Sequence, residues 1–155
     1  MTPTPIGELA VAVDDDGVCA VRFPPFDVPA AATGEARLVE AAGQLDAYFA
    51  GERTRFDLPL SVRRGSDFER AVWAELSRIP YGEMRTYGEV AAAAGDAGAA
   101  RAVGVACNRN PLPIVVPCHR VVGAGGKLVG FGGGLPRKRF LLELEARVAL
   151  QQAWS

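Results

Sequence analysis

The sequence predicts an α/β (α+β) protein, in which a small N-terminal α/β module at residues 1–64 precedes a mainly helical C-terminal domain at residues 65–155. Strand patterns with tight turns open the chain, whereas helical patterns with capping sequences dominate after residue 65. The length of 155 residues fits one domain or two very small ones. With 49% hydrophobic residues, the chain can bury a core.

The first predicted element is a β-hairpin. Residues 9–13 alternate apolar and small side chains, and residues 14–17 (Asp-Asp-Asp-Gly) are a strong turn sequence. Residues 18–23 then resume the strand pattern. Pro24 and Pro25 end the hairpin, and a loop is predicted up to Thr33.

A helix and an edge strand are predicted to complete the N-terminal module. Residues 35–50 form the helix, because Gly51 stops it and apolar side chains recur on one stripe: Leu38, Ala41, Ala42, Leu45, Tyr48 and Phe49. Residues 56–60 alternate again, and Pro59, which cannot donate to a ladder, favours an edge strand. Nothing in this module points to chemistry.

The C-terminal part is predicted to begin with three helices. A capping box at residues 66–69 (Ser-Asp-Phe-Glu) opens the first, which ends at Pro80 and has an apolar face formed by Phe68, Val72, Leu76 and Ile79. A turn follows at residues 81–83. A second capping box at residues 86–89 (Thr-Tyr-Gly-Glu) opens a short helix to Ala94, and a third helix spans residues 99–108. The two short helices predict a helix-turn-helix with the later one as its recognition helix.

Residues 114–122 (Ile-Val-Val-Pro-Cys-His-Arg-Val-Val) hold the first indication of chemistry. So short an apolar run predicts a buried strand, which Pro117 breaks, so that Cys118 turns toward a pocket. His119, the only histidine, can favour the reactive thiolate. The alternative is an inert core thiol, and this pair alone does not decide.

The remaining C-terminal residues predict a turn and a long helix. Residues 123–127 form a turn between short strands. The last helix begins at Leu135, with Pro136 in the first turn. Its inward face would consist of Phe140, Leu141, Leu144 and Val148.

Charge and cysteine content limit the classes of function. The net charge of −1 does not itself indicate nucleic-acid binding, but residues 101–139 contain seven Arg or Lys and no Asp or Glu. That stretch is either a DNA-binding surface or an ordinary solvated basic face. Cys19, Cys107 and Cys118 form neither a metal-like cluster nor a disulfide framework, which favours a cytoplasmic protein without a metal site. No stretch has the pattern of a transmembrane span or a signal peptide.

Residues 117–121 (Pro-Cys-His-Arg-Val) resemble the active-site motif of the O6-alkylguanine-DNA alkyltransferases, also called methylated-DNA–protein-cysteine methyltransferases. The resemblance includes residues 100–104 (Ala-Arg-Ala-Val-Gly), 110–113 (Asn-Pro-Leu-Pro) and 132–135 (Gly-Gly-Gly-Leu). It extends back through residues 79–82 and 86–87 and covers about half of the chain, from residue 68 to residue 145. It implies a ribonuclease H-like N-terminal module and a DNA-binding C-terminal domain.

The resemblance also implies a function. The protein would be a monomer that binds double-stranded DNA, flips out O6-alkylguanine (with O4-alkylthymine as a further candidate) and transfers the alkyl group irreversibly to its own cysteine, without a cofactor. Cys118 would be the acceptor, His119 would deprotonate it through a water, and Glu145 would orient His119. Asn110 would brace the turn before the cysteine. From spacing alone, a solvated helix residue is the more ordinary interpretation of Glu145.

DNA-contacting residues follow from the same resemblance, because a buried thiol can reach the alkyl group only after the nucleotide leaves the stack. Arg101 would fill the vacated space, and the small residues Ala100, Ala102 and Gly104 would let the helix approach DNA. Arg101 could instead bind phosphate. Tyr87 would contact the flipped nucleotide, or simply be a core tyrosine. The base would be surrounded by Tyr87, Cys107, Pro113, Val121, Phe131 and Gly132.

Three departures from the family pattern are visible. Many members carry a hydroxyl residue where this chain has Gly132, and a Tyr is common where it has Phe131, so only the Gly132 backbone N–H could donate to O6. The N-terminal module lacks the Cys/His set that binds structural zinc in some relatives. Two other classes stay open: a hydrolase or other thiol enzyme, which would turn over, and a non-catalytic binder of alkylated DNA.

Overall fold

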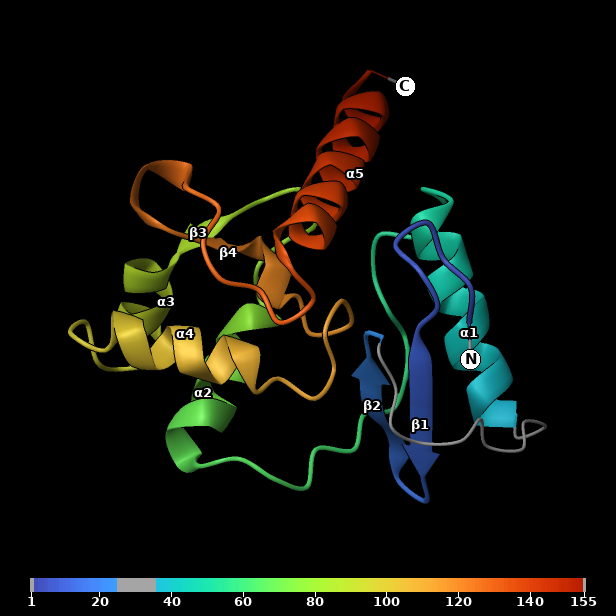
Figure 1. Ribbon diagram of the computed structural model, residues 1–155, viewed down its shortest axis with the longest axis horizontal. Helices are drawn as coiled ribbons and strands as arrows, with labels where there is room; N and C mark the ends of the chain where they lie inside the picture. The colour runs from blue at the N-terminus through green and yellow to red at the C-terminus, as the bar shows by residue number, and fades with distance from the viewer. Residues whose placement is uncertain (1, 25–35, 155) are drawn as a thin grey trace. The chain divides into compact units, whose positions relative to one another are not determined.

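The structure of the protein is a computed structural model, which describes residues 2–24 and 36–154. It divides into two compact units, Met1–Arg63 and Arg64–Ser155. The described residues form five α-helices and two small sheets, which confirms the predicted mixed α/β class (Figure 1). The predicted border between residues 64 and 65 lies one residue from the border of the units, and the independence of the two domains stays a prediction.

The first unit is built on the predicted hairpin. Strands β1 (Ala10–Asp14) and β2 (Gly17–Arg22) pair antiparallel. The register joins Ala12 to Ala20 but Val13 to Val18, so β2 carries one extra residue between these pairs. This bulge bends the hairpin and strengthens its twist.

Asp14 fixes the hairpin turn and ties a later segment to it. One carboxylate oxygen accepts hydrogen bonds from the backbone N–H groups of Asp16 (2.9 Å) and Gly17 (3.2 Å). The other accepts from Ser61 Oγ (2.7 Å) and Arg63 Nε (3.0 Å). The hydrogen bond from Ser61, followed by that from the Asp16 backbone, lowers the pKa of Asp14 to about 2. The acidic turn is therefore a structural junction.

Helix α1 (Ala36–Phe49) lies beside the hairpin (Figure 1). Its buried face contains Ala41, Leu45 and Tyr48, which belong to the predicted stripe. Gly51 follows with φ +76°, the left-handed geometry that suits glycine after a helix. Residue 35, the predicted helix start, and the predicted loop from residue 25 to Thr33 lie outside the described residues.

The edge strand predicted at residues 56–60 is wrong. Only an isolated parallel bridge between Val18 and Leu60 forms, in which Val18 N donates to Pro59 O and Ser61 N donates to Val18 O, both at 2.8 Å. Pro59 has no N–H, so a ladder cannot continue through it. The backbone at Pro59 nevertheless lies very close to the hairpin turn. A Cβ on Gly17, which has φ +152°, would lie 2.2 Å from Pro59 O.

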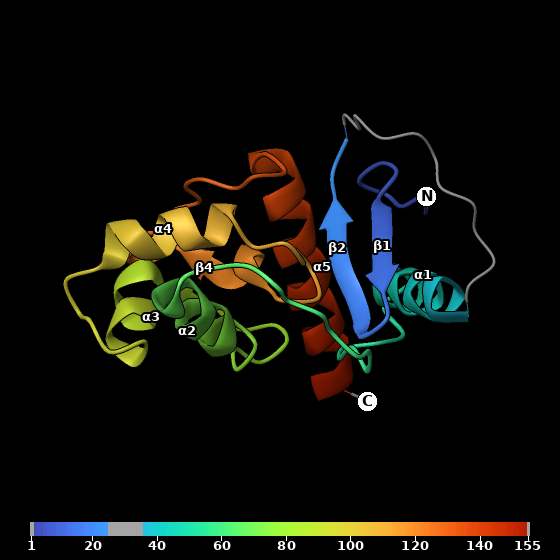
Figure 2. The ribbon, with the colours of Figure 1, turned by 90° about the horizontal axis from the view of Figure 1, so that it is seen from below.

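Three helices pack together at the start of the second unit (Figure 2). They are α2 (Asp67–Leu76), α3 (Tyr87–Ala93) and α4 (Ala100–Asn108). Both predicted capping boxes are present, at residues 66–69 and 86–89. Helix α2 ends earlier than the predicted Pro80, because a residue before proline disfavours helical geometry and the backbone tightens into turns after Leu76.

The strand predicted over residues 114–122 is mostly wrong. Ile114 has φ +75° within a turn, and residues 118–120 form a short 3-10 helix, η1 (Cys118–Arg120). Only β4 (Val121–Val122) is a strand, paired parallel with β3 (Arg85–Thr86). The run is apolar because it is buried, since Ile114 and Val116 are 1% and 5% exposed.

The turn predicted at residues 123–127 contains a second 3-10 turn, η2 (Ala124–Gly126), closed by a 2.8 Å hydrogen bond from Gly123 N to Lys127 O. The strand expected after it is absent from the described residues, and the chain runs directly to α5 (Leu135–Ala153). This helix begins at Leu135 with Pro136 in its first turn, as predicted.

The inward face of α5 is mainly as predicted. Leu141, Leu144 and Val148 are buried, whereas Phe140 is half-buried. Lys138 and Glu145 are also buried on this helix, at 0% and 1% exposure. Buried charges need partners, and those partners form the site described below. No helix of the described ranges combines the length and apolarity required to cross a membrane.

Two glycines of the first unit give a matched stability test. Gly17→Ala should destabilise the protein by about 1–3 kcal/mol, because its Cβ would overlap the Pro59 backbone. Gly43→Ala should instead stabilise it by about 0.5–1 kcal/mol, since Gly43 lies inside α1 and its Cβ would meet no atom within 4 Å. Thermal melting of both variants checks the pair. A neutral Gly17→Ala would contradict the close approach.

Candidate active site

Cys118 is the first residue of η1 and is 5% exposed. Asn110 fixes the turn in front of it: Asn110 Nδ2 donates to Val116 O (2.8 Å), and Leu112 N donates to Asn110 Oδ1 (2.9 Å). Cys118 N donates to Val116 O as well, at 2.8 Å. Asn110 therefore holds the carbonyl against which the cysteine backbone is anchored.

The environment of Cys118 disfavours a free thiolate. Burial raises the pKa of its thiol, and the hydrogen bond from Asn110 and the charge of Lys138 oppose this only in part. The thiol therefore needs a base that takes its proton when it reacts.

His119 and Glu145 form a buried pair behind the cysteine. His119 Nε2 lies 2.7 Å from Glu145 Oε2, and the two side chains are 0% and 1% exposed. An ionised carboxylate only accepts hydrogen bonds, so Nε2 carries the proton. The other ring nitrogen, Nδ1, is buried and has no hydrogen-bond partner among residues 2–24 and 36–154. The solvated-helix interpretation of Glu145 is thereby excluded.

Arg120 is a site residue that sequence reasoning missed. Its Nε and Nη2 donate to the two oxygens of Glu145 at 2.8 and 3.0 Å, and its Nη1 donates to Ile79 O at 2.7 Å. Gly82 N also donates to Glu145 Oε1, at 3.2 Å. The position of this arginine inside an apolar run could have indicated its role, because a guanidinium that is buried there needs a carboxylate partner.

A second group of contacts surrounds Tyr87, the first residue of α3. Tyr87 Oη donates to Val129 O (3.0 Å), and Lys138 Nζ donates to Val129 O and Gly130 O at 3.2 and 3.3 Å. Lys138 Nζ also lies 5.7 Å from the centroid of the Tyr87 ring. Burial lowers the pKa of Lys138 and raises the pKa of Tyr87 to about 12. Lys138 is a second residue that the sequence analysis did not predict for the site. Its positive charge acts on the Cys118 thiol.

The other residues predicted to line the base pocket differ in burial. Pro113 and Val121 are buried, and Cys107 is partly buried on α4, where burial raises its pKa to about 12. Phe131 is half-buried and Gly132 is exposed, both in the loop before α5. A Cβ on Gly132 would meet no atom within 4 Å.

Helix α4 carries the predicted DNA-contacting residues. Its inner face buries Val103 and Ala106, and Trp73 Nε1 fixes it to α2 through a 2.8 Å hydrogen bond to Ala106 O. Arg101 and Ala102 are exposed, whereas Ala100 and Gly104 are half-buried. A Cβ on Gly104 would lie 3.9 Å from the ring of Tyr87, so the helix and the tyrosine are neighbours.

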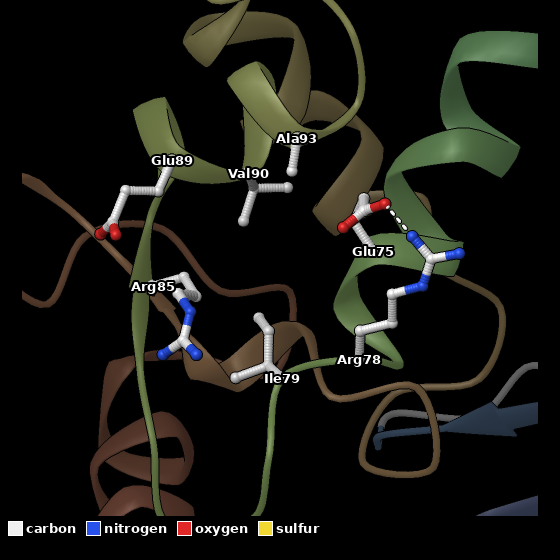
Figure 3. Close-up of a pocket in the computed structure, with 7 residues that line it drawn as sticks. All are labelled: Glu75, Arg78, Ile79, Arg85, Glu89, Val90 and Ala93. Carbon is white, nitrogen blue, oxygen red and sulfur yellow. Dashed lines mark hydrogen bonds and ion pairs between the residues drawn. The ribbon is translucent and has the colours of Figure 1, made fainter.

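A pocket of the second unit lies apart from the thiol, since Cys118 does not line it (Figure 3). It has a volume of about 300 Å³ and lies against α2 and α3. Its arginines are already paired, Arg78 with Glu75 and Arg85 with Glu83. Its lining offers neither a nucleophile nor an unpaired base: Glu75, Arg78, Ile79, Arg85, Glu89, Val90 and Ala93. Within the described ranges, no three His, Cys, Asp or Glu residues are grouped to hold a metal ion.

Two family models match the chain. Residues 67–147 match the 6-O-methylguanine DNA methyltransferase, DNA binding domain, and residues 1–62 match the ribonuclease-like domain of the same family. The chain is 51% identical to a methylated-DNA–protein-cysteine methyltransferase of Mycolicibacterium paratuberculosis, with 93% of this chain and 89% of the relative covered. A protein of the same name from Methanosarcina acetivorans is 49% identical, with 92% and 94% covered.

A solved structure is similar over nearly the whole chain. The crystal structure of Mycobacterium tuberculosis OGT in complex with DNA has a TM-score of 0.85 and 49% sequence identity, and the match covers 94% of this chain and 90% of that one. The two-part architecture of a ribonuclease-like module and a helical DNA-binding domain is thus supported by sequence and by structure.

Two asparagines at the end of α4 test the brace in front of Cys118. Asn110→Ala should lower stability by about 1–3 kcal/mol, because the Leu112 N–H would lose its hydrogen bond to Asn110 and the Val116 carbonyl would lose one of its two buried donors. Asn108→Ala, at an exposed position two residues earlier, should change stability by less than about 0.5 kcal/mol. Denaturant melts of both variants measure the difference. Equal losses would show that Asn110 is not a special brace.

Proposed function

Since this chain belongs to the 6-O-methylguanine DNA methyltransferase family, we propose that it repairs DNA by moving the alkyl group of O6-alkylguanine onto Cys118. The observation that carries this assignment is the buried series Cys118, His119, Glu145, in which a nucleophile, a base and an orienting carboxylate follow one another. Asn110 holds the turn that presents the thiol.

The transfer is a single displacement. Cys118 Sγ attacks the alkyl carbon, the S–C bond forms as the C–O6 bond breaks, and the bonding electrons go to O6. The thiol proton passes toward His119 Nδ1, the unprotonated ring nitrogen, and the departing guanine regains a proton on its ring. The thioether has no leaving group that water can displace, so each molecule reacts once. No metal ion or diffusible cofactor takes part in this step.

The base-binding residues of this proposal are Tyr87, Cys107, Pro113, Val121, Phe131 and Gly132. Because Gly132 has no side chain and Phe131 has no hydroxyl, the leaving oxygen can accept a hydrogen bond only from the Gly132 backbone N–H at this edge. Burial raises the pKa of Cys118, and the positive charge of the Lys138 ammonium near the thiol opposes this rise in part. That charge favours the developing thiolate as the proton leaves.

DNA binding is assigned to the helix pair α3 and α4, used as a helix-turn-helix with α4 as the recognition helix. Arg101 is exposed on α4 and would fill the space of the flipped nucleotide, while Ala100, Ala102 and Gly104 allow close approach. The basic residues of positions 101–139 would contact phosphates. We expect a monomer acting on double-stranded DNA.

The cytoplasm is the proposed location. Cys19, Cys107 and Cys118 are all free thiols in the structure, and an acceptor cysteine must stay reduced until it meets its substrate. A thiol hydrolase and a non-catalytic binder are the competing classes, and the next experiment separates all three.

Mass spectrometry after incubation with O6-methylguanine DNA tests the proposed function. The protein should gain one methyl group, located on Cys118, and then stop reacting. Cys118→Ser should abolish transfer while binding to alkylated duplex stays within a few-fold. Continued turnover would indicate a hydrolase, and binding without transfer would indicate a passive binder. A methyl group on Cys107 would overturn the assignment of the acceptor.

Arg101→Ala tests the base-flipping role. Repair of duplex DNA should slow strongly, whereas reaction with free O6-benzylguanine should change little, because a free base has no stacking energy of a few kcal/mol to overcome. Arg78→Ala is the matched control, since Arg78 is exposed on the surface and paired with Glu75. Single-turnover rates on both substrates provide the measurement. Equal losses of Arg101→Ala on the two substrates would eliminate the wedge role.

A further inference from the structure

The Glu145 carboxylate receives at least four hydrogen bonds from the described residues, more than the orientation of His119 requires. The donors are His119 Nε2 (2.7 Å), Arg120 Nε (2.8 Å), Arg120 Nη2 (3.0 Å) and Gly82 N (3.2 Å). Arg120 thus approaches both oxygens in the two-pronged geometry that guanidinium and carboxylate favour. The pair is buried, with the side chains of Arg120 and Glu145 at 9% and 1% exposure.

The turn at residues 79–82 holds this ion pair from two sides. At its start, Ile79 O accepts from Arg120 Nη1 at 2.7 Å, and at its end Gly82 N reaches Glu145. Between them, the ring of Tyr81 lies 5.5 Å from the guanidinium carbon of Arg120. Gly82 has φ +79°, and a Cβ there would lie 2.9 Å from the Cβ of Ala149, so the turn requires glycine.

The positive charge of Arg120 affects the protonation of His119, because both side chains contact the same carboxylate. A lone buried carboxylate beside His119 would draw a proton onto the imidazole, because the resulting pair would be neutral as a whole. With Arg120 present, Glu145 is already neutralised by a permanent cation. An additional imidazolium would leave net positive charge in a buried site, which costs free energy.

We propose that Arg120, held by the turn at residues 79–82, is a positioning residue that keeps His119 neutral, with its proton on Nε2 and its free Nδ1 available to the Cys118 thiol. This inference rests on the proposed function. Arg120 acts through Glu145, to which its guanidinium donates two hydrogen bonds.

The charged and titratable groups around His119 agree with this assignment. They are Glu145 and Lys138 from α5, and Arg120 and Cys118 from η1. Burial lowers the pKa of His119, the contact with Glu145 opposes this, and the charges of Arg120 and Lys138 act with burial. Burial alone would raise the pKa of Glu145, but its bonds to His119 and Arg120 hold it well below the usual range.

The first test uses the unmodified protein. Because His119 is the only histidine, NMR of imidazole nitrogens reports on it without ambiguity. At pH 7 the ring should be neutral and protonated on Nε2, and it should accept a proton only at a pH below that of an ordinary histidine. A charged ring at pH 7, or a proton on Nδ1, would overturn the inference whether or not any variant folds.

The second test is a charge cycle of Arg120→Met, Glu145→Gln and the double variant, read as the pH dependence of reaction with free O6-benzylguanine. In Arg120→Met, Glu145 charges His119, so the pH at which activity is lost on acidification should rise by about 1–3 units. In Glu145→Gln it should fall, and the double variant should return toward the unmodified protein. Arg78→Met, which removes a surface arginine, is the control and should leave the pH at which activity is lost unchanged.

The outcomes separate this inference from the proposed function. A purely structural Arg120 predicts slower reaction at every pH with an unmoved acid limb, and that result would contradict the inference. If Arg120→Met does not fold, the double variant and the NMR tautomer decide. If the unmodified protein takes up no methyl group on Cys118, the proposed function fails, while the NMR experiment still measures the charge of His119.

Discussion

The ion pair between Arg120 and Glu145 is the interaction on which the rest of the second unit depends. It joins the turn at residues 79–82, the short helix η1 and the long helix α5, which are far apart in the sequence. A buried ion pair is weak evidence of stability, since desolvation offsets much of its attraction, but removal of one partner commonly costs about 3–5 kcal/mol. Its role is therefore to fix positions, and the position it fixes is that of His119.

A buried acceptor thiol combines protection with dependence on a base. Burial raises the pKa of Cys118, so little thiolate is present at neutral pH and unspecific oxidation or alkylation is disfavoured. A protein that reacts once per molecule benefits from such protection, because each wasted thiol is a lost molecule. Under the proposed mechanism, reactivity appears only when a bound base places its alkyl carbon against Sγ and His119 receives the proton.

Local sequence patterns predicted the local structure well. The capping boxes at residues 66–69 and 86–89, the hairpin turn at Asp14 and the start of α5 at Pro136 depend on a few neighbouring residues. The failures concern long-range effects. Burial made residues 114–116 apolar although only an isolated bridge, between Pro113 and Val116, forms there, and the missing N–H of Pro59 left a bridge where a strand was expected. Arg120 and Lys138 were missed because their partners lie on distant elements.

The open space at Gly132 bears on how the leaving group can be stabilised. A Cβ there would meet no atom within 4 Å, so crowding does not explain the absence of a hydroxyl side chain. In the proposed site, the departing oxygen is then served by one backbone N–H rather than by two donors. Lys138, fully buried and fastened to Val129 O and Gly130 O, fixes positive charge to the same loop. Fixed charge that is shielded from water acts more strongly than a mobile hydroxyl dipole at the surface, so under the proposed mechanism Lys138 is the charged group of this loop that is available to support the reaction.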